Sequence, residues 1–157
     1  MGMEIERKFL VINDHWRAVA DAGMDCIQGY FTTNKQCSIR VRLTGDKANL
    51  NIKSATLGIS RSEYDYAIPA KDAEEMLNHL CTKPLIEKKR YQVRYGRHLW
   101  EIDVFSGANT GLVVAEIELA RIDEPFTKPD WVGAEVSDDP RYYNVCLVHH
   151  PYSHWQG

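Results

Sequence analysis

The stretch M-E-I-E-R-K-F-L at residues 3–10 decides the fold. Its alternation predicts a β-strand, in which successive side chains point to opposite faces. One face carries Glu4, Glu6 and Lys8, and the other carries Ile5 and Phe9. A charged face of this kind belongs either to a solvated sheet edge or to a polar interior. The other strands of the chain decide between the two.

Seven further segments show the alternation and the β-branched and aromatic residues of strands. They are residues 26–33, 37–44, 48–54, 59–68, 85–95, 98–105 and 112–120. Gly45 and Asp46 predict a turn that joins two of them into a hairpin, and a loop through Gly58 precedes residues 59–68. Helices are predicted over residues 15–20, 70–81 and 144–149. Beyond Arg121 the pattern weakens, and no further strand is predicted.

Length and composition indicate an ordinary globular protein. The 157 residues, 44% hydrophobic and 26% charged, predict one domain that spans residues 1–157. A net charge of -3 gives no reason to expect nucleic acid or an anionic membrane as a partner. The chain has no signal peptide and no apolar run of about 20 residues, so we expect a cytoplasmic protein, either a monomer or a homodimer. The four cysteines form no C-x-x-C pair and are interpreted as reduced thiols.

Charge signs are segregated by strand. Some strands carry only cations on their polar face, and others carry only carboxylates. The cations are Lys8, Arg40, Arg42, Lys53, Arg61, Lys88 and Arg90. The carboxylates are Glu4, Glu6, Glu63, Asp65, Glu101, Asp103, Glu116 and Glu118. This pattern predicts a mainly β (α+β) fold: a closed eight-stranded antiparallel β-barrel with charged faces inside and apolar faces outside, under a few helices.

The predicted interior favours a particular class of ligand. Several cations in one cavity repel each other unless an anion neutralises them, and arginine pairs suit phosphate oxygens. Carboxylates beside phosphate need a divalent cation between them, and Mg²⁺ or Mn²⁺ takes oxygen ligands. The residues therefore indicate a phosphate chain with one or two metal ions. The alternative is a buried ion-pair network, which carries a large desolvation cost.

The ordered series of motifs resembles the CYTH domain, the family of triphosphate tunnel metalloenzymes. The series is E-x-E-x-K at residues 4–8, Q-G-Y at 28–30, R-x-R at 40–42, Lys53, R-x-E-x-D at 61–65, K-x-R-Y at 88–91, E-x-D-x-F at 101–105 and E-x-E at 116–118. The resemblance spans about residues 3–147 and is strongest to small bacterial members that hydrolyse inorganic tripolyphosphate. Asp65 stands where the family often has glutamate, which shortens the reach of that side chain.

The resemblance implies a metal-dependent phosphohydrolase that converts tripolyphosphate to pyrophosphate and phosphate inside the barrel. The implied phosphate-binding residues are Lys8, Arg40, Arg42, Lys53, Arg61, Lys88 and Arg90. The implied ligands of Mg²⁺ or Mn²⁺ are Glu4, Glu6, Glu63, Asp65, Asp103, Glu116 and Glu118. The implied catalytic residues are Lys8, Glu116 and Glu118.

Other functions stay open at the level of sequence. An adenylyl cyclase, a thiamine triphosphatase or a nucleoside triphosphatase would use the same tunnel, but each needs space for an organic group. A non-catalytic polyphosphate-binding module would not need so many acids, and a structural barrel would pair its charges internally. We also hypothesise that the segment from Arg141, with Tyr142, Tyr143 and Asn144, plugs or gates one mouth of the tunnel.

Overall fold

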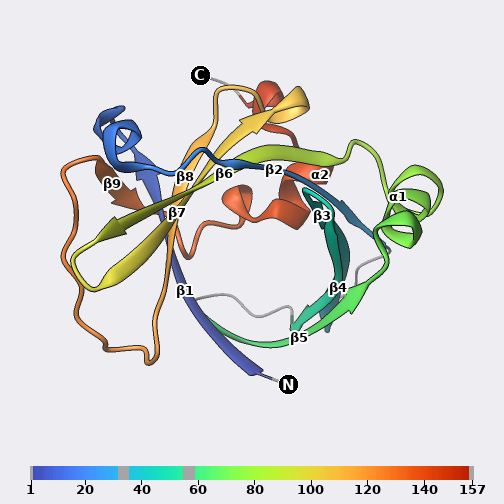
Figure 1. The fold of residues 1–157 in the computed structure, drawn as a ribbon, viewed down its shortest axis with the longest axis horizontal. Coiled ribbons are helices and arrows are strands. Elements are labelled where there is room, and N and C mark those ends of the chain that lie inside the picture. The colour runs from blue at the N-terminus through green and yellow to red at the C-terminus, as the bar shows by residue number, and fades with distance from the viewer. Residues whose placement is uncertain (1, 32–35, 55–58, 156–157) are drawn as a thin grey trace.

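Among the residues that the structure describes, nine strands form one antiparallel sheet that closes into a barrel (Figure 1). The computed structural model describes residues 2–31, 36–54 and 59–155. The strands are β1 (Gly2–Val11), β2 (Met24–Tyr30), β3 (Cys37–Thr44), β4 (Lys47–Ser54), β5 (Ser60–Ile68), β6 (Ile86–Tyr95), β7 (His98–Ser106), β8 (Val113–Glu118) and β9 (Val132–Glu135). Their order is β5-β4-β3-β2-β6-β7-β8-β1-β9, and an additional pairing of β5 with β1 closes eight of them into a ring. The predicted eight-stranded antiparallel barrel is confirmed.

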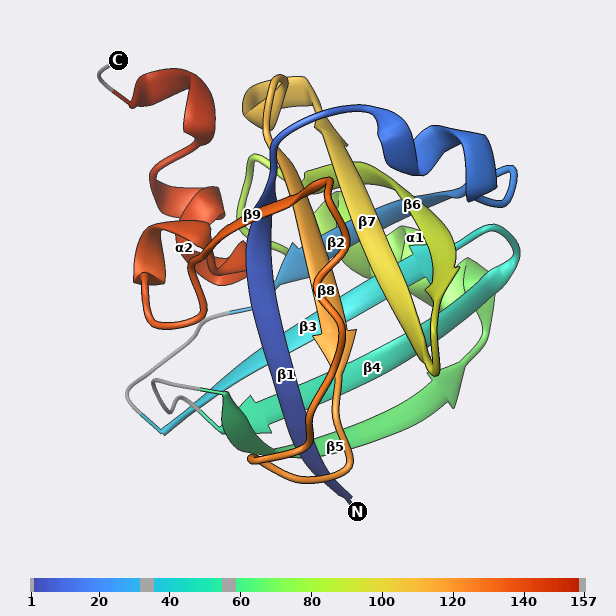
Figure 2. The ribbon, with the colours of Figure 1, turned by 90° about the vertical axis from the view of Figure 1, so that its left-hand side faces the viewer.

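Strand β1 closes the barrel because both of its edges are paired. One edge pairs with β8 from Glu6 to Leu10. The other edge pairs with β5 from Gly2 to Ile5 and with β9 at Phe9 and Val11. Figure 2 shows β1 running the height of the barrel between these neighbours. Sequence reasoning missed β9, which is an addition to the predicted ring.

The remaining elements differ from prediction mainly at their ends. The helices are α1 (Ala70–His79) and α2 (Asn144–His149), with short 3-10 helices η1 (His15–Val19), η2 (Gly107–Asn109), η3 (Pro140–Tyr142) and η4 (Tyr152–His154). The helix predicted over residues 15–20 is the 3-10 turn η1. The predicted ends of the second strand (residues 32 and 33) and the loop at Gly58 lie outside the described residues. Among the described residues, none of the helices has the length and apolar character that crossing a membrane requires.

Two apolar clusters cover the outside of the barrel. Helix α1 packs Ala73 and Leu77 against Val41 on β3. On the opposite side, Trp16, Trp100, Trp131 and neighbouring side chains bury the outer faces of β1, β7 and β8. These clusters confirm that the apolar strand faces point outward, and they leave the opposite faces to line the interior.

A third apolar cluster lies inside the barrel at one end. Helix α2 brings Leu147 and Val148 against Tyr30, Ile86 and Phe105, which share strand faces with the charged residues. Figure 1 shows α2 within the ring of strands. The interior is therefore charged along part of its length and apolar where the C-terminal helix enters it. The sequence analysis predicted the charged interior faces but not the apolar section at this end.

Candidate active site

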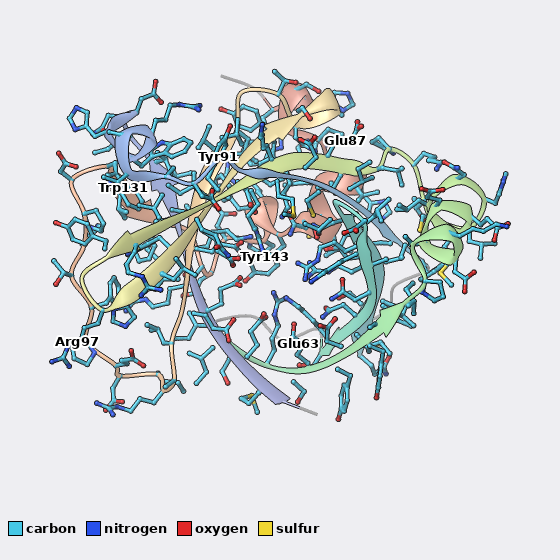
Figure 3. The ribbon with its side chains drawn as sticks, in the orientation of Figure 1. Glu63, Glu87, Tyr91, Arg97, Trp131 and Tyr143 are labelled. Carbon is cyan, nitrogen blue, oxygen red and sulfur yellow. The ribbon has the colours of Figure 1, made fainter. Side chains whose placement is uncertain are left out.

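The charged part of the interior is a cavity of about 270 Å³. Figure 3 shows side chains from the strands pointing into the ring, with Glu63 and Tyr143 among the residues that line it. Most of the residues predicted for the site line this cavity. They are Glu4, Glu6, Lys8, Arg40, Arg42, Lys53, Arg61, Glu63, Asp65, Arg90, Glu116 and Glu118. The fold thus brings together side chains from six different strands.

Two predicted site residues lie behind the cavity wall. Lys88 and Asp103 are 3% and 1% exposed, and Lys88 Nζ donates to Asp103 Oδ2 at 2.8 Å. Arg90 donates to the same carboxylate from Nε at 2.7 Å and from Nη2 at 2.8 Å. Burial alone would raise the pKa of Asp103, but Arg90 and Lys88 outweigh it and hold the pKa below its usual value. This buried triad fixes the Arg90 guanidinium, whose Nη2 also reaches Glu116 Oε1 at 2.8 Å.

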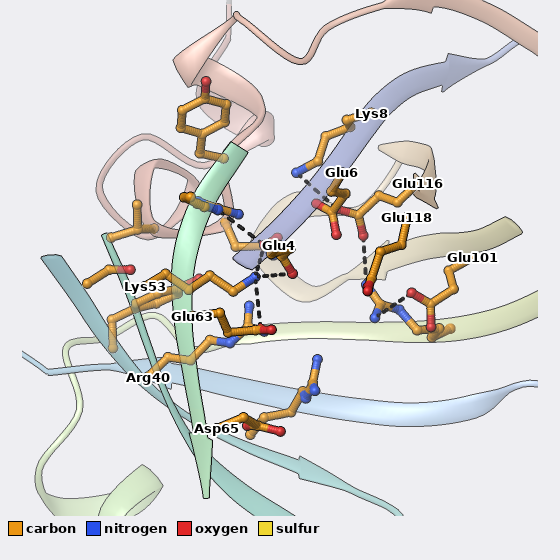
Figure 4. A pocket seen from close by; sticks show the side chains of 18 residues that line it. Glu4, Glu6, Lys8, Arg40, Lys53, Glu63, Asp65, Glu101, Glu116 and Glu118 are labelled. Carbon is orange, nitrogen blue, oxygen red and sulfur yellow. Dashed lines mark hydrogen bonds and ion pairs between the residues drawn. The ribbon is translucent and has the colours of Figure 1, made fainter. Parts of the chain in front are cut away.

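A second ion-pair group lies where β1, β4 and β5 meet. Lys53 Nζ is 2.9 Å from Glu4 Oε1 and 3.8 Å from Glu63 Oε2. Arg61 Nε donates to the same Glu4 oxygen at 3.2 Å. Burial and the nearby charge of Arg40 lower the pKa of Lys53. Glu4 is thus the counter-charge of two cations, as Figure 4 shows for its contact with Lys53.

Glu6 and Glu116 form a hydrogen-bonded pair of carboxyl groups beside Lys8. Burial and the neighbouring Glu116 raise the pKa of Glu6 well above its usual value. Burial also disfavours the charge of Glu116, but Lys8, the hydrogen bond with Glu6 and Arg90 hold its pKa well below the usual range. Lys8 Nζ is 3.6 Å from Glu116 Oε2 and donates to the main-chain oxygen of Tyr142 at 3.0 Å. These opposite pKa shifts favour a proton on Glu6 and a negative charge on Glu116, and the two groups titrate as a pair.

The carboxylates of this region suit a hard divalent cation. Burial and the acidic neighbours Glu4, Glu63 and Glu101 raise the pKa of Glu118. Two carboxylates that are held together by a proton present the oxygen ligands that Mg²⁺ and Mn²⁺ prefer, and a cation can replace the proton. Among the described residues, no three acidic, histidine or cysteine side chains already form a metal-binding group. Phosphate oxygens and water would have to complete the coordination, as is usual for Mg²⁺.

Arg40 and Arg42 differ from the other cations of the site. Lys8, Lys53, Arg61, Lys88 and Arg90 are each within ion-pair distance of a carboxylate. Neither Arg40 nor Arg42 is ion-paired with a carboxylate of the described residues. Burial and the guanidinium groups of Arg40 and Arg90 lower the pKa of Arg42, as expected for a cation without a close counter-charge.

Some residues that line the cavity were not predicted from the sequence to bind phosphate, bind metal or take part in catalysis. Tyr30 and Ser38 line the cavity, and Tyr30 belongs to the Q-G-Y motif, which was the only signal for it. Tyr143 and Asn144 line it from the start of α2. The hypothesised plug segment therefore does reach the cavity, and its Tyr142 oxygen accepts from Lys8. Its effect on activity stays a prediction.

Comparisons with known proteins agree with this geometry. Residues 2–143 match the family model described as the CYTH domain. An inorganic triphosphatase of Acetivibrio thermocellus is 48% identical over 156 residues, which is 99% of each chain. An inorganic triphosphatase of Nitrosomonas europaea is 35% identical over 152 residues, which is 92% of this chain and 96% of the relative.

Solved structures show the same fold. The crystal structure of an inorganic triphosphatase superimposes with a TM-score of 0.65 and 32% identity, covering 92% of this chain and 97% of the other. A putative adenylyl cyclase from Hippeastrum, described as having a dominant triphosphatase activity, superimposes with a TM-score of 0.60 at 15% identity over 75% of this chain and 80% of the other. The second likeness concerns the fold alone.

Proposed function

Because the chain belongs to the CYTH-domain family, we propose that it is an inorganic triphosphatase that hydrolyses tripolyphosphate to pyrophosphate and phosphate inside its barrel. The observation that carries this proposal is one cavity in which lysines and arginines face carboxylates from neighbouring strands. Cations alone would suit anion binding, whereas the added acids suit a metal ion and proton transfer. The relative that is 48% identical over nearly the whole length carries the same activity in its name.

Phosphate binding is assigned first to the two arginines of β3. Arg40 and Arg42 lack carboxylate partners, so a phosphate oxygen can approach each guanidinium without displacing an existing ion pair. Lys53, Arg61 and Arg90 line the same cavity and add positive charge around the phosphate chain. In this proposal Lys88 does not contact phosphate directly, because its ammonium is fully buried against Asp103.

Metal binding is assigned to Glu6, Glu116 and Glu118, with Mg²⁺ or Mn²⁺ as the ion. When bound, the ion neutralises charge on the phosphates and makes the terminal phosphorus more open to attack. Glu6 and Glu118 are favoured because neither is ion-paired with a cation among the described residues, whereas Glu4 and Asp103 are. Glu116 is ion-paired with Arg90 and is included because it is hydrogen-bonded to Glu6. Metal ligation by Glu4, Glu63, Asp65 and Asp103 stays a prediction from the family resemblance.

The side chains of the site account for the remaining chemistry. A water oxygen attacks the terminal phosphorus, the bond to the bridging oxygen breaks, and pyrophosphate leaves. Glu118 accepts the proton of the attacking water, since its raised pKa makes it a better base than an ordinary glutamate. Lys8, positioned by Glu116 and the Tyr142 oxygen, stabilises negative charge on the transferred group.

Phosphate release tests the proposal directly. Tripolyphosphate, ATP, thiamine triphosphate and pyrophosphate are each supplied with Mg²⁺, Mn²⁺ or EDTA. We expect metal-dependent turnover of tripolyphosphate above all others, and a large loss in Glu116→Gln. The matched control is Glu74→Gln on the exposed face of α1, which should behave as wild type.

The alternatives give different results in the same assay. Cyclic AMP among the products of ATP would identify a cyclase, and preferred turnover of thiamine triphosphate would identify that hydrolase. Tight triphosphate binding without any turnover would identify a polyphosphate-binding module. A melting temperature that triphosphate and Mg²⁺ leave unchanged would favour a structural barrel, since a ligand of the folded state must raise it.

A further inference from the structure

We propose that Asn49 and Asn51 are positioning residues that hold the acids of β5 away from the arginines of β3 and so keep Arg40 and Arg42 available for phosphate. The inference rests on the proposed function, because it explains how the triphosphate-binding pair stays unpaired. The two asparagines form an amide spacer, a name used below for this pair alone.

The strand order places the amide spacer between opposite charges. Strand β4 lies between β3, which carries the two arginines, and β5, which carries Glu63 and Asp65. In the register of these strands, Arg40 is opposite Asn51, and Asn51 is opposite Asp65. Arg42 is likewise opposite Asn49. Opposite residues share a face of the sheet, so an amide lies between Arg40 and Asp65. Beside Arg42, Asn49 is opposite Ala67 and reaches Asp65 diagonally.

The amides are hydrogen-bonded to the acids. Asn51 is 2% exposed, and its Nδ2 donates to Glu63 Oε2 at 3.0 Å and to Asp65 Oδ1 at 3.2 Å. Asn49 Nδ2 is 3.1 Å from both carboxylate oxygens of Asp65. Hydrogen bonds from neutral amides to carboxylates are charge-assisted and therefore strong. They fix the two acids on the β5 side of the cavity.

The arginine side shows the complementary pattern. Arg40 is 7% exposed, and its Nε has no hydrogen-bond partner among the described residues. The Oδ1 atom of Asn51 is also buried without a described partner. Buried polar atoms of native proteins nearly always have partners, so an unsatisfied Nε on an arginine that lines the cavity points to an anionic ligand. The Arg40 side chain is hydrogen-bonded to Tyr30, and phosphate oxygens supply the anionic acceptor that no carboxylate of the described residues provides.

Removing the spacer would create competing ion pairs. Strands β3 and β5 are two strand spacings apart, about 10 Å, a gap that an arginine and an acidic side chain can bridge together. Asp65 already acts on Arg42 at longer range, since its charge partly offsets the lowering of the Arg42 pKa. With the amides replaced by apolar side chains, Asp65 and Glu63 would turn toward the arginines. Triphosphate would then have to break those pairs in order to bind.

The test is binding of tripolyphosphate by isothermal titration calorimetry in EDTA, where no turnover and no metal ligation interfere. We expect Asn51→Leu to bind roughly tenfold more weakly than wild type, because the released acid competes with the anion. Asn49→Leu should have the same effect to a smaller degree. The double variant Asn51→Leu/Asp65→Asn should regain much of the lost affinity, because the competing charge is gone. Gln92→Leu is the matched control: Gln92 lies near the cavity on β6, and its side chain has no hydrogen bond to Glu63 or Asp65.

Each outcome of the titration either supports or overturns the spacer role. Equal affinity of wild type and Asn51→Leu, or a double variant as weak as the single one, would overturn the spacer role while leaving the proposed function intact. Absence of binding to wild type in EDTA would also overturn the spacer role, because Arg40 and Arg42 would then not hold the phosphate chain by themselves. Absence of metal-dependent turnover in the phosphate-release assay would instead overturn the proposed function. If Asn51→Leu does not fold, as circular dichroism would show, Asn49→Leu with and without Asp65→Asn gives the same comparison at a half-buried position.

Discussion

Replacing Asp103 by asparagine should strongly destabilise the fold, although the change adds no bulk. Asp103 is 1% exposed and accepts charged hydrogen bonds from Lys88 and Arg90 at 2.7–2.8 Å. In Asp103→Asn, two buried cations lose their shared counter-charge. Removing one partner of a buried ion pair lowers the free energy of unfolding by about 3–5 kcal/mol. For a chain of this size, each kcal/mol lowers the melting temperature by about 2–4 °C, so a fall of roughly 6–20 °C is expected.

The control is an ion pair with the same geometry on the surface. Arg141 Nη2 is 2.7 Å from Asp139 Oδ2, but the side chain of Arg141 is 60% exposed. Water screens such a pair, and Asp139→Asn should leave the melting temperature almost unchanged. Both variants are compared with wild type by thermal unfolding without ligand. Equal shifts for the two variants would refute the reasoning that burial sets the cost.

The lowered pKa of Asp103 also predicts how the loss of stability in Asp103→Asn depends on pH. The pKa of Asp103 is lowered in the folded state, so its contribution to stability is present above the ordinary pKa of an aspartate. That contribution is lost as the pH falls through the folded-state pKa. The difference in melting temperature between wild type and Asp103→Asn should therefore be full at neutral pH and shrink toward strongly acidic pH. A difference that grows on acidification would contradict this sign.

Three further predictions concern the metal, the C-terminal helix and a close strand–helix contact. The pKa of Glu6 is raised well above its usual value, and a proton on Glu6 competes with a metal ion, so the Mg²⁺ concentration for half-maximal phosphate release should fall as the pH rises; a concentration that does not change with pH would exclude Glu6 as a ligand. Ending the chain at Tyr143 removes Leu147 and its neighbours from the barrel interior. The free energy of unfolding, measured in urea, should fall by roughly 3–6 kcal/mol. Unchanged stability and activity would rule out the plug. A Cβ at Gly29 would lie 2.7 Å from both Cβ and Sγ of Cys81, so Gly29→Ala should lower the free energy of unfolding by about 1–3 kcal/mol, and adding Cys81→Gly, which removes both atoms, should reduce that loss.

The sequence predicts which faces of the strands are charged, because side chains alternate strictly along a strand. Glu4, Glu6 and Lys8 point inward and Phe9 points into the outer core, as the alternation in residues 3–10 indicates. The same reasoning located α1, whose helical spacing of apolar residues matches the face it buries. Local pattern suffices for these features because each depends on one segment and one apolar layer.

Features that depend on distant segments could not be predicted. Strand β9 has four residues, V-G-A-E, with no alternation to reveal it, and it forms because β1 presents an unpaired edge beyond Ile5. The helix at residues 144–149 was predicted and a plug at one tunnel mouth was hypothesised, but nothing in its six residues N-V-C-L-V-H shows that helix α2 packs inside the barrel. Its place follows from the apolar interior surface of Tyr30, Ile86 and Phe105, which comes from three separate strands.

Strand order also explains why arginines in similar motifs have different surroundings. Strand β6 lies beside β7, so Arg90 is directly opposite Asp103 and is neutralised by it. Strand β3 lies between β2 and β4, whose inward positions opposite the arginines hold only tyrosine and amide side chains. The guanidinium groups of Arg40 and Arg42 therefore remain available to an anionic ligand. Arg90 instead donates hydrogen bonds to Asp103 and Glu116 in the barrel wall. Affinity for phosphate should consequently depend on the two uncharged asparagines of β4, because an acid at either position would neutralise the arginine beside it.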